Sequence, residues 1–346
     1  MKYQRVFLEA IGYELAPVVV TSAELEVRLA PLYRKLHLAP GQLEFLTGIA
    51  ERRWWEEDFS LSTGAARAAR RALERSPLQA QDIDVIIYAG VCREDFEPAT
   101  ACRVAAELGL SPATIYDLSN ACLGVMNGVL EIANRIELGH IRAGLVVSCE
   151  SAREIQEIAV EQMLADGSME CFSESLATLT GGSGAAAVVI SNGSFGSGQR
   201  PRLLSGIAKS APQYHHLSRW GLRREPSGAY RQYMVTRSAD VLQHGVQLGV
   251  ETWAAFLAEL GWSAASIDGV ICHQVGSGHR DSILEALQIP EEKDFSSYEF
   301  LGNMGTVSLP LTAALAEGRE FLRPGHQVGF LGIGSGLNCL MLGWQW

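Results

Sequence analysis

Short, continuous apolar runs recur along this chain and alternate with longer runs of helical spacing. The apolar runs are rich in β-branched residues and lie at 84–90, 143–150, 184–191, 268–275 and 326–334. Runs of this length and composition are typical of strands that are buried on both faces of a sheet. Between these runs, apolar residues recur at helical spacing at 63–75, 99–109, 122–138, 240–260, 279–288 and 305–321. This alternation predicts an α/β architecture with mostly parallel sheets that are covered by helices.

Two glycine-rich turns, each followed by an apolar run, are similar to one another. They are "GGSGAAAVVISNG" at 181–193 and "GIGSGLNCLMLGW" at 332–344. Because each turn follows a comparable succession of strands and helices, we expect two duplicated halves, 1–195 and 196–346. We expect a first strand in the N-terminal "MKYQRVFLEAIGYELAP". The segment 196–237, which is richer in Gly, Arg and aromatic residues, is expected to be a connection with loops.

The composition excludes several classes of protein. A formal charge of −11, without a basic stripe, argues against nucleic acid as a partner. The 47% of hydrophobic and 19% of charged residues indicate a globular chain with a substantial core. Seven scattered cysteines predict neither a disulfide framework nor a metal site, and we see no signal peptide or membrane span. We therefore expect a cytoplasmic protein that uses no metal.

One cysteine lies at the start of a predicted helix. In "LSNACLGVMNGVLEIANRIELGH", residues 118–140, Asn120 is a plausible N-cap and apolar residues follow at helical spacing. Cys122 would then lie at the positive end of the helix dipole, where a thiolate is favoured over a thiol. A nucleophilic cysteine needs such a lowered pKa. The alternative is a small buried core residue, the commoner fate of cysteine.

A histidine and an asparagine follow at similar positions. His273 in "ICHQVGSGH" comes directly after an apolar strand, and Asn303 in "EFLGNMGTVSLP" lies between glycines before a predicted helix. Strand ends and helix starts are where α/β sheets build their sites. Taken singly, His273 is equally well a core histidine and Asn303 a helix cap.

Four motifs together resemble those of the thiolase-fold condensing enzymes. They are "SNACLG", "CHQVGSGH", "LGNMGTVSLP" and "GIGSGLNC", and they occur in the family's order from about residue 45 to the C-terminus. The chain is most similar to the ketoacyl-acyl-carrier-protein synthases III and to the OleA-type acyl-CoA condensing enzymes. The resemblance implies a five-layered αβαβα thiolase fold with two duplicated halves, usually a homodimer. It also implies an acyltransferase that acts on acyl-CoA or phosphopantetheine thioesters and uses no metal or redox cofactor.

The resemblance also assigns roles to these residues. Cys122 would accept an acyl group from a thioester. Its backbone N–H, with one from the turn near Ser335, would form the oxyanion hole. His273 and Asn303 would then donate hydrogen bonds to the oxygen of an enolate formed from a second thioester.

A glutamate upstream of the cysteine bears on how that enolate forms. Glu97, in "VCREDFEPAT", aligns with the OleA-type glutamate, with a spacing to the cysteine that is one residue shorter, a gap placed in "LSPAT" at 110–114. In that family the glutamate reaches the partner subunit's site and removes a proton next to a thioester carbonyl. Glu97 would need a raised pKa in an apolar, dimer-buried setting. The alternative is a solvated charge favoured by the following helix.

The "GIGSGLNC" turn and the insert at 151–180 also look like the OleA type. In that insert, four apolar residues are candidates for the wall of an acyl channel, although such residues are more often ordinary core. These are Met163, Leu164, Met169 and Phe172.

The phosphates of a thioester carrier require a local basic entrance in this acidic chain. Arg52, Arg53 and Trp54 fall where the family begins its entrance region, and an Arg–Trp pair can sandwich an adenine. Arg280 is the further substrate-binding candidate that we favour, beside Arg223 and Arg224. A solvated surface role is the alternative for each arginine.

Three functions are open from the sequence. The first is non-decarboxylative condensation of two acyl-CoA molecules to a 2-alkyl-3-ketoacyl-CoA. The second is decarboxylative condensation of malonyl carrier protein with an acyl-CoA primer, and the third is a non-catalytic acyl-binding subunit. An acyl carrier protein or downstream enzymes are further partners that the resemblance allows.

Overall fold

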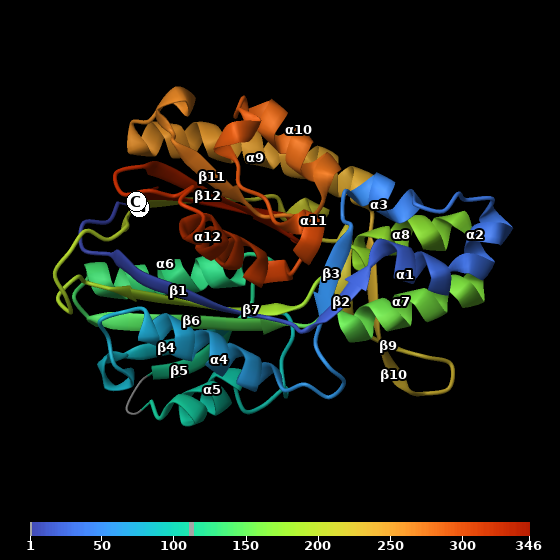
Figure 1. Ribbon diagram of the computed structural model, residues 1–346, viewed down its shortest axis with the longest axis horizontal. Helices are drawn as coiled ribbons and strands as arrows, with labels where there is room; N and C mark the ends of the chain where they lie inside the picture. The colour runs from blue at the N-terminus through green and yellow to red at the C-terminus, as the bar shows by residue number, and fades with distance from the viewer. Residues whose placement is uncertain (1, 111–113) are drawn as a thin grey trace.

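The computed structural model describes residues 2–110 and 114–346, and its layers are visible in Figure 1. Helices α9 and α10 lie on one outside face, above strands β11 and β12. Helices α6 and α12 lie in the middle, above a second layer of strands that contains β1, β7 and β6, and α4 and α5 cover the opposite outside face. The order of layers is therefore helix, strand, helix, strand, helix.

The strands are β1 (Phe7–Leu15), β2 (Val18–Thr21), β3 (Glu51–Trp54), β4 (Val85–Ala89), β5 (Thr114–Leu118), β6 (Ala143–Glu150), β7 (Gly184–Ser191), β8 (Arg202–Ser210), β9 (Ser218–Arg224), β10 (Tyr230–Thr236), β11 (Gly269–Cys272), β12 (Gln327–Gly334) and β13 (Asn338–Gln345). The helices are α1 (Ser22–Arg28), α2 (Ala30–Leu36), α3 (Gln42–Thr47), α4 (Leu61–Glu74), α5 (Thr100–Leu108), α6 (Gly124–Glu137), α7 (Arg153–Asp166), α8 (Met169–Leu179), α9 (Ser238–Leu260), α10 (Ser277–Leu287), α11 (Tyr298–Leu301) and α12 (Ser308–Gly318).

The main sheet is mixed, so the expectation of mostly parallel sheets is wrong. Its order is β11-β12-β13-β8-β1-β7-β6-β4-β5, and β1 meets β8 through one residue pair, Phe7 with Arg202. Parallel pairing occurs between β4 and β5, β4 and β6, and β11 and β12. The central strands pair antiparallel, β13 with β8, β8 with β1, β1 with β7 and β7 with β6. The antiparallel pair of β12 and β13 is a hairpin, in which Gly334 pairs with Asn338.

The predicted strands and helices are found, with shifted ends. The runs at 143–150 and 184–191 are β6 and β7 with the predicted bounds. The helix predicted from 305 begins as a 3₁₀ turn at Gly305–Val307 before α12. The interpretation of 196–237 as loops is wrong, because this segment holds β8, β9 and β10. The strands of 1–195 and those of 196–346 occupy opposite ends of the sheet order, but the division at 195 stays a prediction.

The central helix α6 is packed tightly between the strand layers. Its predicted apolar face is buried, as Val125, Val129, Ile132 and Ile136 show. A Cβ at Gly128 would lie 2.7 Å from Val146 of β6, so glycine is required at this close approach. The helix begins at Gly124 with Leu123 as N-cap, and the prediction of Asn120 as N-cap is wrong.

The insert at 151–180 forms α7 and α8, which pack with α1 and α2 in an extension beside the layered body (Figure 1). The hairpin β9–β10 contacts both insert helices. In the described residues, none of the helices has both the length and the apolar character that crossing a membrane requires.

Candidate active site

Cys122 lies in the turn between β5 and the start of α6. Burial raises the pKa of its thiol to about 12, and the nearby Glu150 carboxylate adds to this rise. The expectation of a thiolate-stabilising environment is therefore corrected for the substrate-free protein. The helix begins two residues after Cys122, and removing the sulfur from water outweighs the favourable backbone N–H.

A chain of amide hydrogen bonds fixes this turn. The side chain of Asn338 donates to Oδ1 of Asn120 at 3.1 Å and to the carbonyl of Ser335 at 3.3 Å. Asn120 donates in turn to Oδ1 of Asn127 at 2.7 Å. The bonds therefore link the cysteine turn to the hairpin turn that carries the second predicted oxyanion donor.

The loop of Asn303 is tied to the same helix. The hydroxyl of Thr306 accepts a hydrogen bond of 2.7 Å from the N–H of Val125, and both residues are almost completely buried. Asn303 itself bonds through its backbone to Thr180, and its side-chain oxygen accepts from the N–H of Gly305. Thr306 thus satisfies one of the free N–H groups at the start of α6.

His273 follows β11 and is buried. Burial, with a further contribution from His279, lowers the pKa of its imidazole to about 3. Within the described residues its Nδ1 has no hydrogen-bond partner. The imidazole is therefore neutral at physiological pH and can accept a proton from a thiol or donate to an oxygen.

Two cavities meet at the cysteine. One, of about 320 Å³, is lined by Cys122, His273 and Asn303 together with apolar residues of α8, α9 and β10. The other, of about 470 Å³, is lined by Cys122, Asn303, Glu150 and residues of α7, α8 and the β9–β10 hairpin. The structure thus brings the three predicted side chains to one space. Both cavities share six residues: Cys122, Ala177, Ser218, Met234, Asn303 and Ser335.

Glu97 lies apart from these cavities. It is exposed in the segment between β4 and α5, beside Phe96, whose side chain is 94% exposed. Within the described part of the chain, Glu97 lines neither cavity that contains Cys122. The predicted dimer-buried setting is not present in the single chain. The one-residue gap expected at 110–114 falls largely on 111–113, outside the described residues.

Two predicted substrate-binding residues belong to the core. The side chain of Arg52 is fully buried, with its guanidinium donating to the carbonyl of Val20 and to the hydroxyl of Ser22. Trp54 is 6% exposed, and its indole N–H donates to Gln156 at 2.7 Å. The prediction that Arg52 and Trp54 sandwich an adenine is therefore wrong. Strand alternation in β3 turns both side chains to its buried face.

The remaining arginines are distributed over different surfaces. Arg53 lies on the half-exposed face of β3, and its role stays a prediction. Arg280 donates to Asp294 at 2.6 Å and lines neither of the two cavities at Cys122, so its charge is already engaged in the protein. Arg223 and Arg224 are exposed on β9.

The four predicted channel residues do not line the cavities at Cys122. Met163 and Phe172 pack in the core that α7 and α8 share with α1 and α2. Leu164 and Met169 are 40% and 48% exposed. The wall is formed instead by the end of α8, with Leu176, Ala177 and Thr180.

Sequence reasoning missed several residues of the site. Glu150 closes β6, and a carboxylate at a strand end is a recognisable signal for a site residue. Its oxygens accept hydrogen bonds from the N–H groups of Val91 at 2.9 Å and Cys92 at 3.1 Å. The bonds of Asn338 and Thr306 join segments far apart in the chain, so no local sequence signal could have revealed them.

Known proteins share this structure over its full length. Residues 257–346 match the family described as 3-oxoacyl-[acyl-carrier-protein (ACP)] synthase III C terminal. A β-ketoacyl-[acyl-carrier-protein] synthase III from Streptomyces coelicolor is 28% identical, covering 96% of this chain and 94% of its own. A variant of Xanthomonas campestris OleA, solved with bound lauric acid and lauroyl-CoA, superposes with a TM-score of 0.92 at 32% identity, covering 99% of this chain and 100% of that one.

The similarity is higher still to an acyl-CoA:acyl-CoA alkyltransferase from Shewanella oneidensis. The two sequences are 55% identical, and the match covers 100% of each chain. The expectation of a thiolase-fold acyltransferase is thereby confirmed. The chain belongs to the acyl-CoA:acyl-CoA alkyltransferase family, the OleA type of the thiolase-fold condensing enzymes.

Proposed function

We propose that this enzyme joins two fatty acyl-CoA molecules head to head, without decarboxylation, to form a 2-alkyl-3-ketoacyl-CoA. The observation that carries the proposal is the meeting of two cavities at Cys122. One cavity can hold the acyl chain bound to the sulfur, and the other can hold the chain of the second substrate. The bound lauroyl-CoA and lauric acid of the Xanthomonas relative support substrates of this class.

The first step is the transfer of an acyl group to Cys122. Because the pKa of this thiol is about 12, its proton must leave as the sulfur attacks the thioester carbonyl. Neutral His273, in the same cavity, accepts that proton. The tetrahedral oxyanion is held by the N–H of Cys122 and one near Ser335. When the C–S bond to CoA breaks, the proton passes from His273 to the departing sulfur, which yields CoA and neutral imidazole.

The second step forms the carbon–carbon bond. Glu97 removes a proton from the carbon next to the carbonyl of the second acyl-CoA, and His273 and Asn303 donate to the enolate oxygen. The enolate carbon attacks the acyl carbonyl on Cys122 and breaks the bond between that carbonyl carbon and the sulfur. The thiolate regains a proton from Glu97, so the enzyme returns to its starting state.

Glu97 must come from a second copy of the chain in this scheme. It lines neither cavity that contains Cys122, whereas it is exposed beside an exposed phenylalanine, Phe96. A homodimer would bury both residues and would place Glu97 in an apolar setting. Mixing Cys122→Ala and Glu97→Gln subunits tests this arrangement. Mixed dimers should regain condensation at one of their two sites, whereas unmixed samples of each variant should remain inactive.

The proposed reaction needs acyl-CoA and no cofactor, and we propose that it takes place in the cytoplasm. Arg53 remains the candidate from the sequence for contacting CoA, and docking to an acyl carrier protein or to downstream enzymes stays a prediction.

Product analysis with a single long-chain acyl-CoA tests the reaction type. The proposal predicts release of CoA and a β-keto thioester that contains two acyl chains. No product from acyl-CoA alone, with turnover appearing once malonyl carrier protein is added, would establish the decarboxylative alternative. The motivation for that alternative is the synthase III match of residues 257–346.

A further inference from the structure

The segment that carries Glu97 is held at both ends by carboxylates. This segment follows β4 and ends where α5 begins. In the sheet, β4 lies between β5 and β6. Each of these neighbours supplies one carboxylate from its carboxyl end. Glu150 of β6 accepts from the N–H groups of Val91 and Cys92, where the segment begins. Asp117 of β5 accepts from the first N–H groups of α5, where it ends.

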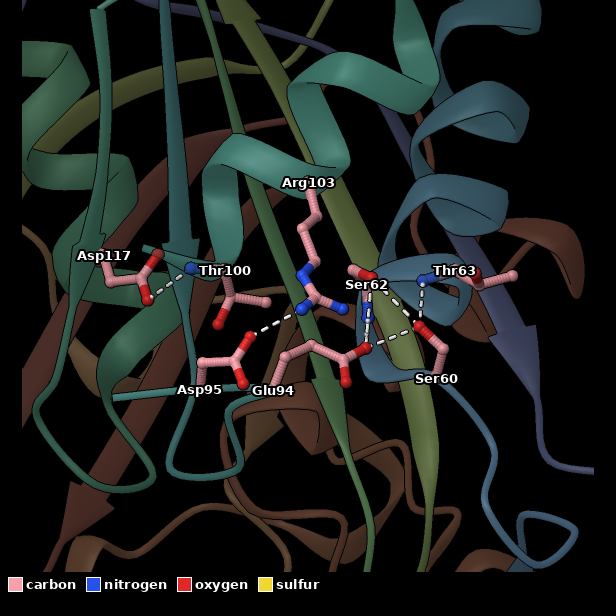
Figure 2. A network of polar contacts seen from close by, with 8 residues as sticks. All are labelled: Ser60, Ser62, Thr63, Glu94, Asp95, Thr100, Arg103 and Asp117. Carbon is pink, nitrogen blue, oxygen red and sulfur yellow. Dashed lines mark hydrogen bonds and ion pairs between the residues drawn. The ribbon is translucent and has the colours of Figure 1, made fainter. Parts of the chain in front are cut away.

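A third carboxylate lies within the segment. Figure 2 shows Glu94 beside the start of α4, where one of its oxygens accepts from the hydroxyl of Ser60 at 2.5 Å and from the hydroxyl and N–H of Ser62 at 3.0 and 2.9 Å. Burial favours the neutral acid, but these hydrogen bonds outweigh it and lower the pKa of Glu94. Glu94 is therefore ionised at neutral pH and fastens the segment to a helix that lies outside it.

The end of the segment, where α5 begins, is also fixed by a carboxylate. Asp117 accepts from the N–H groups of Thr100 and Ala101 at 2.9 Å each, as Figure 2 shows for Thr100. The N-cap residue of α5, Ala99, has no side chain that could serve. Asp117 thus replaces the missing cap from a different strand, where its charge also favours the start of the helix.

Glu97 lies midway between these attachments. It is three residues after Glu94 and three before Thr100, so its Cα is within about 10 Å of each of theirs. Within the described residues, Glu97 itself makes no hydrogen bond or ion pair. The segment is thus fixed where it begins and ends, while Glu97, between these points, is exposed and accessible to a second copy of the chain.

We propose that Glu94 and Asp117 are positioning residues that hold Glu97 in place to act on substrate in the partner subunit. This inference rests on the proposed function, in which Glu97 is the base. A catalytic group that is misplaced by about 1 Å can lose roughly a hundredfold in rate. The two carboxylates therefore affect condensation and leave acyl transfer to Cys122 unchanged. Glu94 lies on a different loop from Cys122. Asp117 lies on β5, the strand before the turn of Cys122, but its carboxylate bonds to the N–H groups of α5.

Four variants test the proposal, each measured for the burst of CoA that reports acylation and for the steady rate of condensation. Glu94→Ala and Asp117→Ala should lower kcat for condensation at least tenfold, with KM and the burst within twofold of the unaltered enzyme. Glu94→Gln and Asp117→Asn keep an oxygen acceptor at the same place and should recover most of the rate.

Glu107→Ala is the matched control. Glu107 also joins α5 to α4, accepting from the hydroxyl of Thr63 at 3.2 Å, but it lies at the far end of α5 from Glu97. Its condensation rate should be unchanged. If Glu94→Ala does not fold, Ser62→Ala removes one donor to the same carboxylate and should slow condensation several-fold with an intact burst.

Two results would overturn the inference. One is condensation by the alanine variants within twofold of the Glu107→Ala control. The other is a parallel loss of the burst and of condensation, which would indicate general structural damage. Glu97→Gln separates the inference from the proposed function. If Glu97→Gln abolishes condensation while Glu94→Ala does not, the inference fails alone, whereas full condensation by Glu97→Gln would remove the basis of both.

Discussion

The hydrogen bond between Thr306 and Val125 allows a direct test of what stabilises the start of α6, the helix that follows Cys122. Thr306 follows the loop of Asn303, and its hydroxyl accepts from the N–H of Val125 near the start of α6 at 2.7 Å. Both residues are 2% exposed or less, so water cannot replace the hydroxyl. Thr306→Val replaces that hydroxyl with a methyl group and leaves the shape of the side chain nearly unchanged.

The expected loss of stability follows from the N–H group of Val125, which has no acceptor in the variant. A buried donor without its partner costs about 1–3 kcal/mol. With an unfolding entropy of about 2.1 cal/mol/K per residue, a chain of 346 residues loses roughly 1.4 °C in Tm for each kcal/mol. Thr306→Val should therefore lower Tm by about 1.4–4 °C. Acylation should also slow, because Val125 is three residues from Cys122.

Thr100 provides a matched control for thermal unfolding. It is 1% exposed, and its hydroxyl has no hydrogen-bond partner among the described residues. Thr100→Val should leave Tm unchanged or raise it, since an unsatisfied buried hydroxyl is removed. If both variants melt at the same temperature, the Thr306 hydroxyl does not stabilise the helix start and this reasoning is refuted.

Three further predictions concern the site. Iodoacetamide should alkylate Cys122 in the substrate-free enzyme about ten times faster for each pH unit between about pH 7 and pH 9, because the thiolate reacts and the pKa of this thiol is about 12. A rate that stays constant above pH 7 would contradict this. Glu150→Gln should speed the alkylation several-fold, because it removes a negative charge that raises the pKa of the thiol. Gly336→Ala should lower the acylation rate at least tenfold. The added Cβ would lie 2.4 Å from the side-chain amide nitrogen of Asn338, and the backbone φ of +142° favours glycine. An unchanged CoA burst would show that the hydrogen bonds from Asn338 to the turn of Cys122 are not needed for acylation. Arg52→Met should leave the KM for acyl-CoA within twofold, and a tenfold rise would restore the sequence-based assignment of Arg52 to CoA binding.

The buried strands could be predicted from the sequence, whereas the exposed hairpin could not. The runs that became β6 and β7 are continuously apolar because both faces of these strands are covered, and this signal is strong. The strands β9 and β10 are exposed or half-exposed along most of their length, with Arg and aromatic side chains. Their polar composition resembled that of a loop, since only long-range packing makes them strands.

The position of Cys122, His273 and Asn303 around one space could be anticipated, but their electrostatics could not. A helix start near Cys122 suggests a low pKa when burial is ignored. The structure adds removal from water and the charge of Glu150, a residue 28 positions away, and these raise the pKa instead. Local patterns place residues on elements, whereas desolvation depends on everything packed around them.

At the predicted substrate entrance, Arg52 to Trp54, the alternation of side chains along a strand was the sequence signal for which residues share a face. Residues 52 and 54 of a strand face the same side, so an arginine and a tryptophan at these positions are either both exposed or both buried. The extension that contains α7 and α8 covers that side, and the bond of Trp54 to Gln156 comes from it. The covering helices could not be placed from the sequence.

Intact-protein mass spectrometry of Glu97→Gln with a long-chain acyl-CoA tests the central claim most directly. The claim is that Cys122 holds one acyl chain while Glu97 activates the other. The account predicts that this variant accumulates a single acyl group on Cys122 and releases no β-keto thioester, whereas the unaltered enzyme turns the same substrate into condensed product. A Glu97→Gln protein that stays unmodified, or that condenses acyl-CoA at the unaltered rate, would contradict it.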